Sequence, residues 1–205
     1  MSWRRKSEID DELHEAIMEA TARAIAEHGI ADLTVRDIGA EFDRSRSLIH
    51  YHYNSKDDLL AAFVEYIVDR YTETGVDADG DPEEQLDTFV RRYLFGPETD
   101  PDEHWQRFAA QYALRPAAMH DERLRGVLVD NYERIHATLT EIVRAGVERG
   151  VFADVDPELT AQLVLAVLDS ARGQKLILGD DDAPDTLYLA LGELVYPDLG
   201  IEPKT

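Results

Sequence analysis

Basic, hydroxyl and imidazole side chains gather in the segment RSRSLIHYHYNSK, residues 44–56, which contains no Asp or Glu. The whole chain has 43 acidic residues and 21 Lys and Arg, so this segment differs in sign from its surroundings. An arginine can donate two hydrogen bonds to the edge of a guanine in the major groove, and lysine and hydroxyl groups bind phosphate. A carboxylate at the same place would be repelled by phosphate. The segment therefore predicts contact with duplex DNA.

Two short helices joined by a tight turn are expected to present this segment. Thr34 followed by Asp37 predicts a capping box that begins the first of these helices, which should last barely two turns. A turn at residues 43–44 leads to a second short helix over residues 45–52, with Leu48 or Ile49 and Tyr53 facing inward. This is the pattern of a helix-turn-helix, in which the first residues of the second helix reach base edges. The candidates for that contact are Arg44, Ser45, Arg46 and Ser47.

Longer helices are expected on both sides of this pair. Ser7 is expected to cap a first helix that ends at Gly29, because glycine readily takes the left-handed conformation found at helix ends. Ser55, with Asp58 three residues later, predicts the cap of a fourth helix running to about residue 74.

Apolar periodicity predicts that the rest of the chain is also helical, and no segment shows the alternation of a strand. An acidic loop at residues 76–84 is followed by helices expected at about 82–95, 101–114, 121–149, 157–178 and 184–196. The fold class is therefore all-α, with about nine helices. We expect a three-helix helix-turn-helix domain over residues 1–56 and a second helical domain over residues 57–205.

Composition and motifs argue against several classes of function. The chain has no Cys, which excludes disulfides, thiolate zinc sites and Cys nucleophiles. It has no Gly-rich phosphate loop, HExxH motif or Gly-flanked serine. The acidic stretch at 77–81 resembles a calcium loop, but Thr88 stands where the glutamate at the twelfth position should be. We therefore expect no enzyme activity, no metal and no cofactor.

Hydropathy and charge suggest where the protein works. No run of 18 apolar residues is present, and the first residues turn acidic where a signal peptide would need its apolar core, so we expect a cytoplasmic protein without a membrane partner. The net charge is −22, and most of the excess acid lies in residues 57–205. Concentrated salt would screen the resulting repulsion, which favours a halophilic host.

Residues 34–60, TVRDIGAEFDRSRSLIHYHYNSKDDLL, resemble the DNA-binding domain of the TetR family of transcriptional regulators, and the likeness extends over residues 8–60. The positions that carry the resemblance are Thr34, Ile38, Ser45, Ile49, His52, Tyr53, Ser55, Lys56 and Leu59. The resemblance implies that Thr34 and Lys56 contact phosphates. It also implies that Arg46 and Ser47 face bases. The remaining members of the implied DNA-binding set are Arg36, Arg44, Ser45, His50, Tyr51 and His52, of which the last three would hold the DNA backbone.

Five positions depart from the family pattern. Gly39 replaces the usual Ala, Asp-Arg at 43–44 replaces Gly-Val, and Ser47 replaces a common Gly. His50 replaces the usual Tyr, which makes one phosphate contact depend on protonation of an imidazole.

Two roles in this part of the chain stay open. His52 could support the helix from inside instead of touching DNA. Arg4, Arg5 and Lys6 could form an arm over the groove or a frayed end.

A second acid-free segment, HWQRFAAQYALRPAAMH at 104–120, is almost uncharged. Its aromatic residues share one helical face, and Pro116 is expected to break the helix. Such a stripe could be core or could line a pocket. This segment, together with ERGVFADVDPE at 148–158, resembles the BetI-type regulatory domain, which implies an effector cavity among the middle helices. The lining candidates are Phe89, Tyr93, Trp105, Phe108, Tyr112, Tyr132, His136, Leu168 and Arg172.

The last two expected helices are apolar on nearly every side, which favours burial against a second subunit in a symmetric homodimer. The resemblance likewise implies a four-helix dimer interface. The function predicted is a DNA-binding transcriptional regulator, a repressor that a small apolar or amphipathic effector releases from a palindromic or near-palindromic operator in double-stranded DNA. The alternative is an all-helical protein-protein adaptor without DNA binding.

Overall fold

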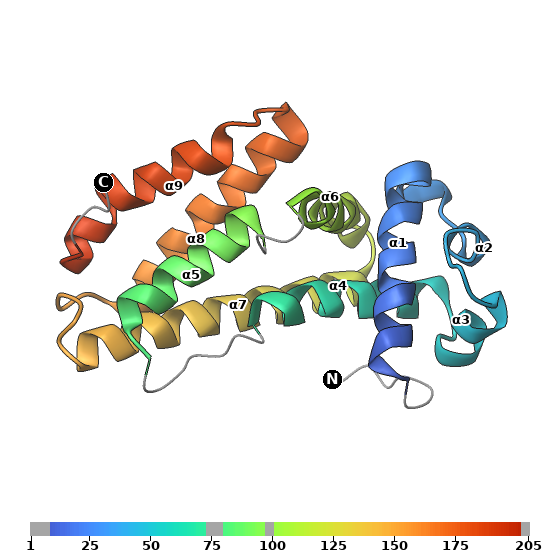
Figure 1. Cartoon of the computed structure of the whole chain (residues 1–205), viewed down its shortest axis with the longest axis horizontal. Coiled ribbons are helices and arrows are strands. Elements are labelled where there is room, and N and C mark those ends of the chain that lie inside the picture. Colours follow the sequence, from blue (N-terminus) through green and yellow to red (C-terminus); the bar gives the residue numbers. More distant parts are fainter. Residues whose placement is uncertain (1–8, 73–79, 97–100, 202–205) are drawn as a thin grey trace. The chain divides into compact units, whose positions relative to one another are not determined.

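The computed structural model describes residues 9–72, 80–96 and 101–201, and these residues confirm the all-α class. Within them there are nine α-helices, a π-helical turn η1 and a 3-10 turn η2, and no strand (Figure 1). The α-helices are α1 (Asp11–Asp32), α2 (Val35–Ile38), α3 (Arg46–His52), α4 (Lys56–Thr72), α5 (Pro82–Phe95), α6 (Pro101–Ala118), α7 (Glu122–Glu148), α8 (Pro157–Gly173) and α9 (Ala183–Leu194). The turns are η1 (Gln174–Leu178) and η2 (Tyr196–Leu199).

The chain forms two compact units, which divide at Arg70–Tyr71, at Pro101–Asp102 and at Asn131–Tyr132. The first unit contains α1 to α4, α6 and the first part of α7. The second contains α5, the rest of α7, α8 and α9 with their turns. The predicted functional boundary at residue 56 stays a prediction.

The described start of the first unit is helix α1. Its N-cap is Asp10, whose carboxylate accepts from the backbone N–H of Glu12. Ser7, the expected cap, and the cluster Arg4, Arg5 and Lys6 lie outside the described residues. Gly29 has φ 68°, so helical geometry is interrupted there, as predicted, although a short helical stretch follows to Asp32.

The capping box that begins α2 is present as predicted. Thr34 Oγ1 accepts from the backbone N–H of Asp37 at 3.3 Å, while the Asp37 carboxylate accepts from the Thr34 N–H at 2.9 Å and from its hydroxyl at 2.6 Å. The helix is only 4 residues long, shorter than expected. Ile38 at its end is fully buried, so packing fixes this short element in place.

Helix α3 is held by its inner face. Ile49 is 1% exposed and is therefore the inward residue that the sequence could not distinguish from Leu48. Tyr53, the C-cap, is buried, and its hydroxyl lies 2.8 Å from Nδ1 of His14 on α1. Ser55 then accepts from the backbone N–H of Asp58 and caps α4, as predicted. Helix α3 is thus held by a buried hydrogen bond to α1 and by a buried apolar side chain.

Helix α6 continues through Pro116 to Ala118, so the expected break at Pro116 is wrong. Proline removes one N–H donor, but its fixed φ is helical, and a helix can continue for a short distance beyond it. Asp121 then caps α7 by accepting from the backbone N–H groups of Arg123 and Leu124.

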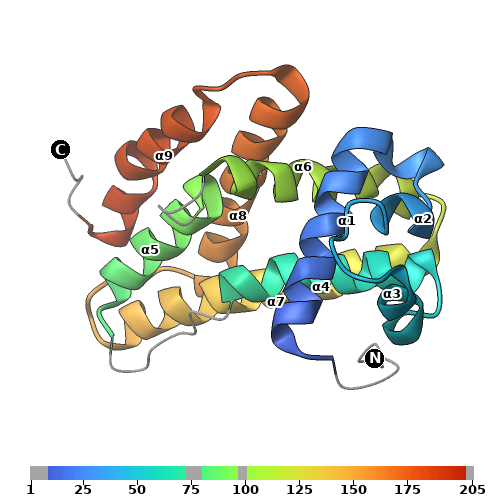
Figure 2. The ribbon, with the colours of Figure 1, turned by 45° about the vertical axis from the view of Figure 1, so that its right-hand side comes forward.

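In the second unit α5, α8 and α9 lie side by side (Figure 2). Asp156 caps α8, with Pro157 at its first position, and Gly179 with φ 71° ends the following turn. The helix expected to run to residue 178 changes to a π-helical turn at Gln174. No helix among the described residues is long and apolar enough to cross a membrane.

The bond between Tyr53 and His14 gives a stability prediction. Tyr53→Phe removes the hydroxyl but keeps the ring, so the free energy of unfolding should fall by about 1 kcal/mol. Tyr51→Phe is the matched control, because the Tyr51 side chain is 62% exposed and its replacement should leave stability unchanged. Urea denaturation of the three proteins would measure this, and equal stability of the two variants would contradict the assigned role of Tyr53.

The α2 capping box gives a pH prediction. Hydrogen bonds from the side chain and then the backbone of Thr34 lower the pKa of Asp37 below its ordinary value. A lowered carboxyl pKa adds stability above the ordinary pKa of about 4, and that stability is lost as the pH falls through the lowered value. In urea denaturation the native protein should therefore have a higher free energy of unfolding than Asp37→Asn at pH 6, and this difference should shrink at acid pH. Thr34→Ser should keep this dependence and Thr34→Val should weaken it, whereas a pH-independent advantage would contradict it.

Candidate nucleic-acid interface

The outer face of α3 carries the predicted base-reading and backbone-binding side chains. Its exposed residues are Ser45, Arg46, Ser47, His50 and Tyr51, together with Arg44 in the preceding turn. The inner face of the same helix carries Ile49 and His52. A seven-residue helix with one face fixed in the core can present the other face as a rigid surface. No acidic residue lies between Arg44 and Lys56, so this surface is positive or neutral along its length.

Arg46 is positioned by the end of α2. Its Nε donates to the backbone carbonyl of Gly39 at 3.3 Å. Ser45 and Ser47 lie beside it, with their hydroxyl oxygens 2.7 Å apart. Short hydroxyl side chains around a longer arginine would let the helix approach a base pair closely.

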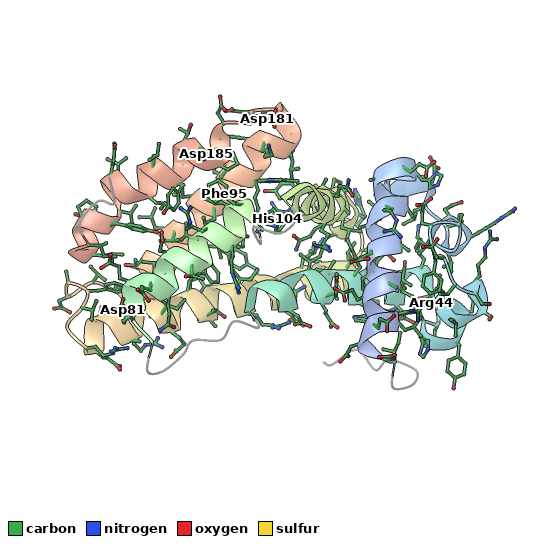
Figure 3. All side chains as sticks on the ribbon, viewed as in Figure 1. Arg44, Asp81, Phe95, His104, Asp181 and Asp185 are labelled. Atoms are coloured by element: carbon green, nitrogen blue, oxygen red, sulfur yellow. The ribbon has the colours of Figure 1, made fainter. Side chains whose placement is uncertain are left out.

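Arg44 has a partner that sequence reasoning missed. The Arg44 side chain is labelled in Figure 3. Its Nη2 donates to Oε1 of Glu12 on α1 at 2.7 Å. The two side chains are 46% and 77% exposed, and an ion pair this open to water contributes only about 0–1 kcal/mol. Arg44 can therefore exchange this carboxylate for a phosphate at small cost. The pair spans 32 positions, so local sequence gave no signal for it.

The side chains predicted to contact phosphate differ in their exposure and hydrogen bonds. Thr34 is exposed, but its hydroxyl already donates to Asp37. Lys56 is half-buried, and Nζ donates to the backbone carbonyl of Leu33 at 3.0 Å. An ammonium has three N–H donors, so Lys56 can bind an anion while keeping this bond. Arg36 is an exposed residue of α2.

His50 and His52 point to different sides of α3. His50 is exposed, whereas His52 is only 7% exposed and meets the Tyr51 ring edge-on, with ring centroids 5.0 Å apart. The position of His52 favours the supporting role that the sequence left open.

The predicted effector-lining residues are distributed over both units. Trp105, Phe108 and Tyr112 belong to α6 in the first unit, where Phe108 is fully buried and Trp105 and Tyr112 are half-buried. Phe108 contacts the ring of His104 at 4.6 Å between centroids, and His104 is itself 1% exposed. Sequence reasoning did not select His104, since a single histidine beside a tryptophan gives no sign of its burial.

Four of the other candidates lie in the second unit, and three of them, Phe89, Tyr93 and Arg172, are in contact. Phe89 stacks on Tyr93 of α5 with ring centroids 6.1 Å apart, and Leu168 is fully buried in α8. Arg172 is 2% exposed, and its Nε and Nη2 both donate to the carbonyl of Tyr93, at 3.1 and 2.7 Å. Its guanidinium also lies over the Tyr93 ring. Phe89, Tyr93 and Arg172 form an aromatic and cationic cluster between α5 and α8.

Tyr132 and His136 lie together elsewhere in the second unit, against the start of α8. The Tyr132 hydroxyl accepts from Gln162 at 2.7 Å, and Nε2 of His136 lies 3.3 Å from the Glu158 carbonyl. Tyr132 is 39% exposed.

Large apolar side chains are exposed along α8, η1 and α9. One side of α8 is open to solvent, with Leu159 69% and Leu163 52% exposed. The opposite side, which includes Val164 and Leu168, is buried within the unit. The remaining exposed members are Ile177, Leu178, Leu189 and Leu194. A surface of this kind is typical of a protein interface.

Comparison with known proteins agrees with this geometry. Residues 17–63 match the family model described as bacterial regulatory proteins, tetR family, and residues 82–194 match the model of the BetI-type transcriptional repressor, C-terminal. A curated protein of Pseudomonas putida, named "Probable HTH-type transcriptional regulator ArpR", is 26% identical over 185 residues, covering 86% of each chain.

Solved structures extend the likeness to the whole fold. A TetR transcription regulator from Haloarcula marismortui is 33% identical with a TM-score of 0.76, and the match covers 90% of this chain and 96% of that one. A transcriptional regulator from Saccharomonospora viridis in complex with choline is 25% identical with a TM-score of 0.70, covering 91% and 97%. Since the two family models match the segments that carry the exposed α3 face and the apolar α8 and α9 helices, the chain belongs to the TetR family of bacterial transcriptional regulators and has a BetI-type C-terminal domain.

Proposed function

We propose that this DNA-binding regulator is a repressor that binds a palindromic or near-palindromic operator as a homodimer and leaves it when a small molecule binds. Members of the family are transcriptional regulators and not enzymes, and the adaptor alternative is not retained. The observation that carries the proposal is the exposed, carboxylate-free face of α3, fixed from behind by Ile49 and by the bond between Tyr53 and His14.

On the DNA side, we assign base contacts to Arg46 and Ser47, beside the N-cap Ser45, and a phosphate contact to Arg44 in the preceding turn. Arg46 has the planar donor pair that matches guanine in the major groove. We assign backbone contacts to Thr34, Arg36, His50, Tyr51 and Lys56, all of which have exposed or half-buried side chains. His52 is proposed to support α3 from inside, because it is buried.

The homodimer is proposed to form through the exposed apolar faces of α8 and α9. A two-fold pair of these faces would bury side chains that water now surrounds, such as Leu163 and Leu194. Two copies of α3 could then meet one duplex in successive major grooves, about 34 Å apart. Any change in the distance between the two copies would weaken both half-site contacts together.

For the effector, we propose a small apolar or amphipathic molecule. The cluster of Phe89, Tyr93 and Arg172 combines aromatic surface with a fixed charge, and the buried Leu168 and the aromatic residues of α6 are further candidates. The choline complex of the Saccharomonospora viridis relative is consistent with an amphipathic ligand. The effector would favour a conformation in which the two copies of α3 cannot both reach one duplex. A coupling free energy of only about 1–3 kcal/mol between effector binding and DNA binding is needed for this.

We further propose that the protein works in the cytoplasm of a salt-adapted host. A net charge of −22 is tolerable where salt shortens the range of repulsion, and the relative from Haloarcula marismortui supports the same inference. Selection of bound duplexes from a random pool by the purified protein tests the function directly. A palindrome with half-sites about one helical turn apart is expected, and recovery of no preferred sequence would refute the proposal.

Substitutions of the two DNA-facing cations should affect DNA binding in different ways. Arg46→Ala should lose about 1–3 kcal/mol of preference at one base pair, because a base contact is removed. Lys56→Ala should weaken binding to all sequences and reduce the slope of log affinity against log salt by about 1. Fluorescence anisotropy with labelled duplexes measures both effects, and circular dichroism checks the fold. Arg134→Ala, on the exposed surface of α7, is the matched control and should bind as the native protein does. Unchanged binding by both DNA-facing variants would contradict the assignment.

Charge placed in the apolar face should separate the subunits. Leu163→Glu would place two carboxylates in the proposed interface, and the dimer should lose at least about 2 kcal/mol of association free energy. Sedimentation velocity at micromolar protein is expected to show a folded monomer with weak operator binding. Val129→Glu on α7, at a side chain that is 46% exposed, is the control and should remain a dimer. A Leu163→Glu protein that stays dimeric would show that the subunits meet elsewhere.

A further inference from the structure

Gly39 stands where the family pattern has alanine, and its backbone does not require glycine. As C-cap of α2 it has φ −69° and ψ −16°, which any L-residue adopts. Its N–H donates to the Val35 carbonyl at 2.9 Å, a bond that alanine would also make. The reason for glycine must therefore lie in the space around it.

That space is filled by the stem of Arg46. A Cβ atom added to Gly39 would lie 2.8 Å from Cγ and 3.0 Å from Cδ of Arg46, and 3.3 Å from the Val35 carbonyl oxygen. Carbon atoms in contact are normally about 3.5–4.0 Å apart. The methyl group of alanine would therefore require the Arg46 side chain to take another path. The backbone of α3 cannot retreat easily, because Ile49 is fixed in the core.

The same contact fixes the direction of the guanidinium. Nε of Arg46 donates to the Gly39 carbonyl, which uses the donor nearest the stem. Nη1 and Nη2 have no hydrogen-bond partner among the described residues. These two groups form the fork that can meet O6 and N7 of a guanine. An arginine already held in place loses less rotamer freedom when it binds.

We propose that Gly39 is a specificity-determining residue that acts by positioning Arg46. The missing side chain lets the arginine stem lie across the end of α2, and the Gly39 carbonyl holds Nε so that the Nη pair is presented to a guanine. Gly39 itself touches no base in this assignment. The inference rests on the proposed function, since it needs Arg46 to read a base pair of the operator.

A double-mutant cycle on the full-length protein tests this assignment. Native protein, Gly39→Ala, Arg46→Ala and the double variant are measured against the selected operator and against operators changed singly at each base pair. Gly39→Ala is expected to lose preference on the order of tenfold at the same base pair that Arg46→Ala no longer distinguishes. In the Arg46→Ala background, Gly39→Ala should have no further effect on preference. The melting temperature of the Gly39→Ala protein should not fall, because the backbone at position 39 accepts alanine.

Gly126→Ala is the matched control, because a Cβ at Gly126 on α7 would meet nothing within 4 Å. It should bind every operator as the native protein does. The inference is overturned if Gly39→Ala keeps the native base preference, if the effects of the two substitutions simply add, or if Gly39→Ala weakens all duplexes equally. Failure of the proposed function would give a different result from failure of this inference. The native protein itself would then select no preferred duplex, and the inference would also be overturned.

Discussion

The sign of the local electrostatic field at α3 is the constraint on which the molecule depends. A chain with net charge −22 must approach a polyanion, and it can do so only where its own carboxylates are absent or occupied. The exposed face of α3 meets this requirement, because no acidic residue lies between Arg44 and Lys56. Two acidic residues of the same unit are engaged, with Glu12 paired to Arg44 and Asp37 held in the capping box of α2. Acidity elsewhere can then be high without preventing DNA binding.

Much of the fold was predictable because the signals that begin and end helices are local. The caps at Thr34 and Ser55 and the interruption at Gly29 depend on a few neighbouring atoms and were confirmed. Predictions failed where a local rule had to compete with packing. Pro116 was expected to stop α6, yet the helix continues to Ala118, and the helix beyond Gly173 changes to a π-helical turn.

The candidate site was predictable in composition more than in detail. The sequence selected residues of α3 that the structure shows to be exposed. It could not choose between Leu48 and Ile49 or decide which side His52 faces, since one short helix has few periodic positions. Partners distant in sequence, such as Glu12 for Arg44 and Tyr93 for Arg172, leave no local trace. The same is true of the aromatic candidates, because periodicity could not distinguish the cluster at Phe89 and Tyr93 from the exposed pair at Tyr132 and His136.

The ion pair between Arg44 and Glu12 also has a consequence for the ionic atmosphere of the complex. In the proposed complex Arg44 exchanges this carboxylate for a phosphate, and DNA gives up close to one condensed cation, about 0.9 for each phosphate neutralised. Glu12 becomes an uncompensated anion beside the duplex and attracts a cation in its place. Release and uptake then nearly cancel at this contact, so Arg44 can help to orient the protein on DNA while adding little to the dependence of affinity on potassium or sodium. In a salt-loaded cell, that exchange would let Arg44 take part in operator binding without making occupancy more sensitive to the salt concentration.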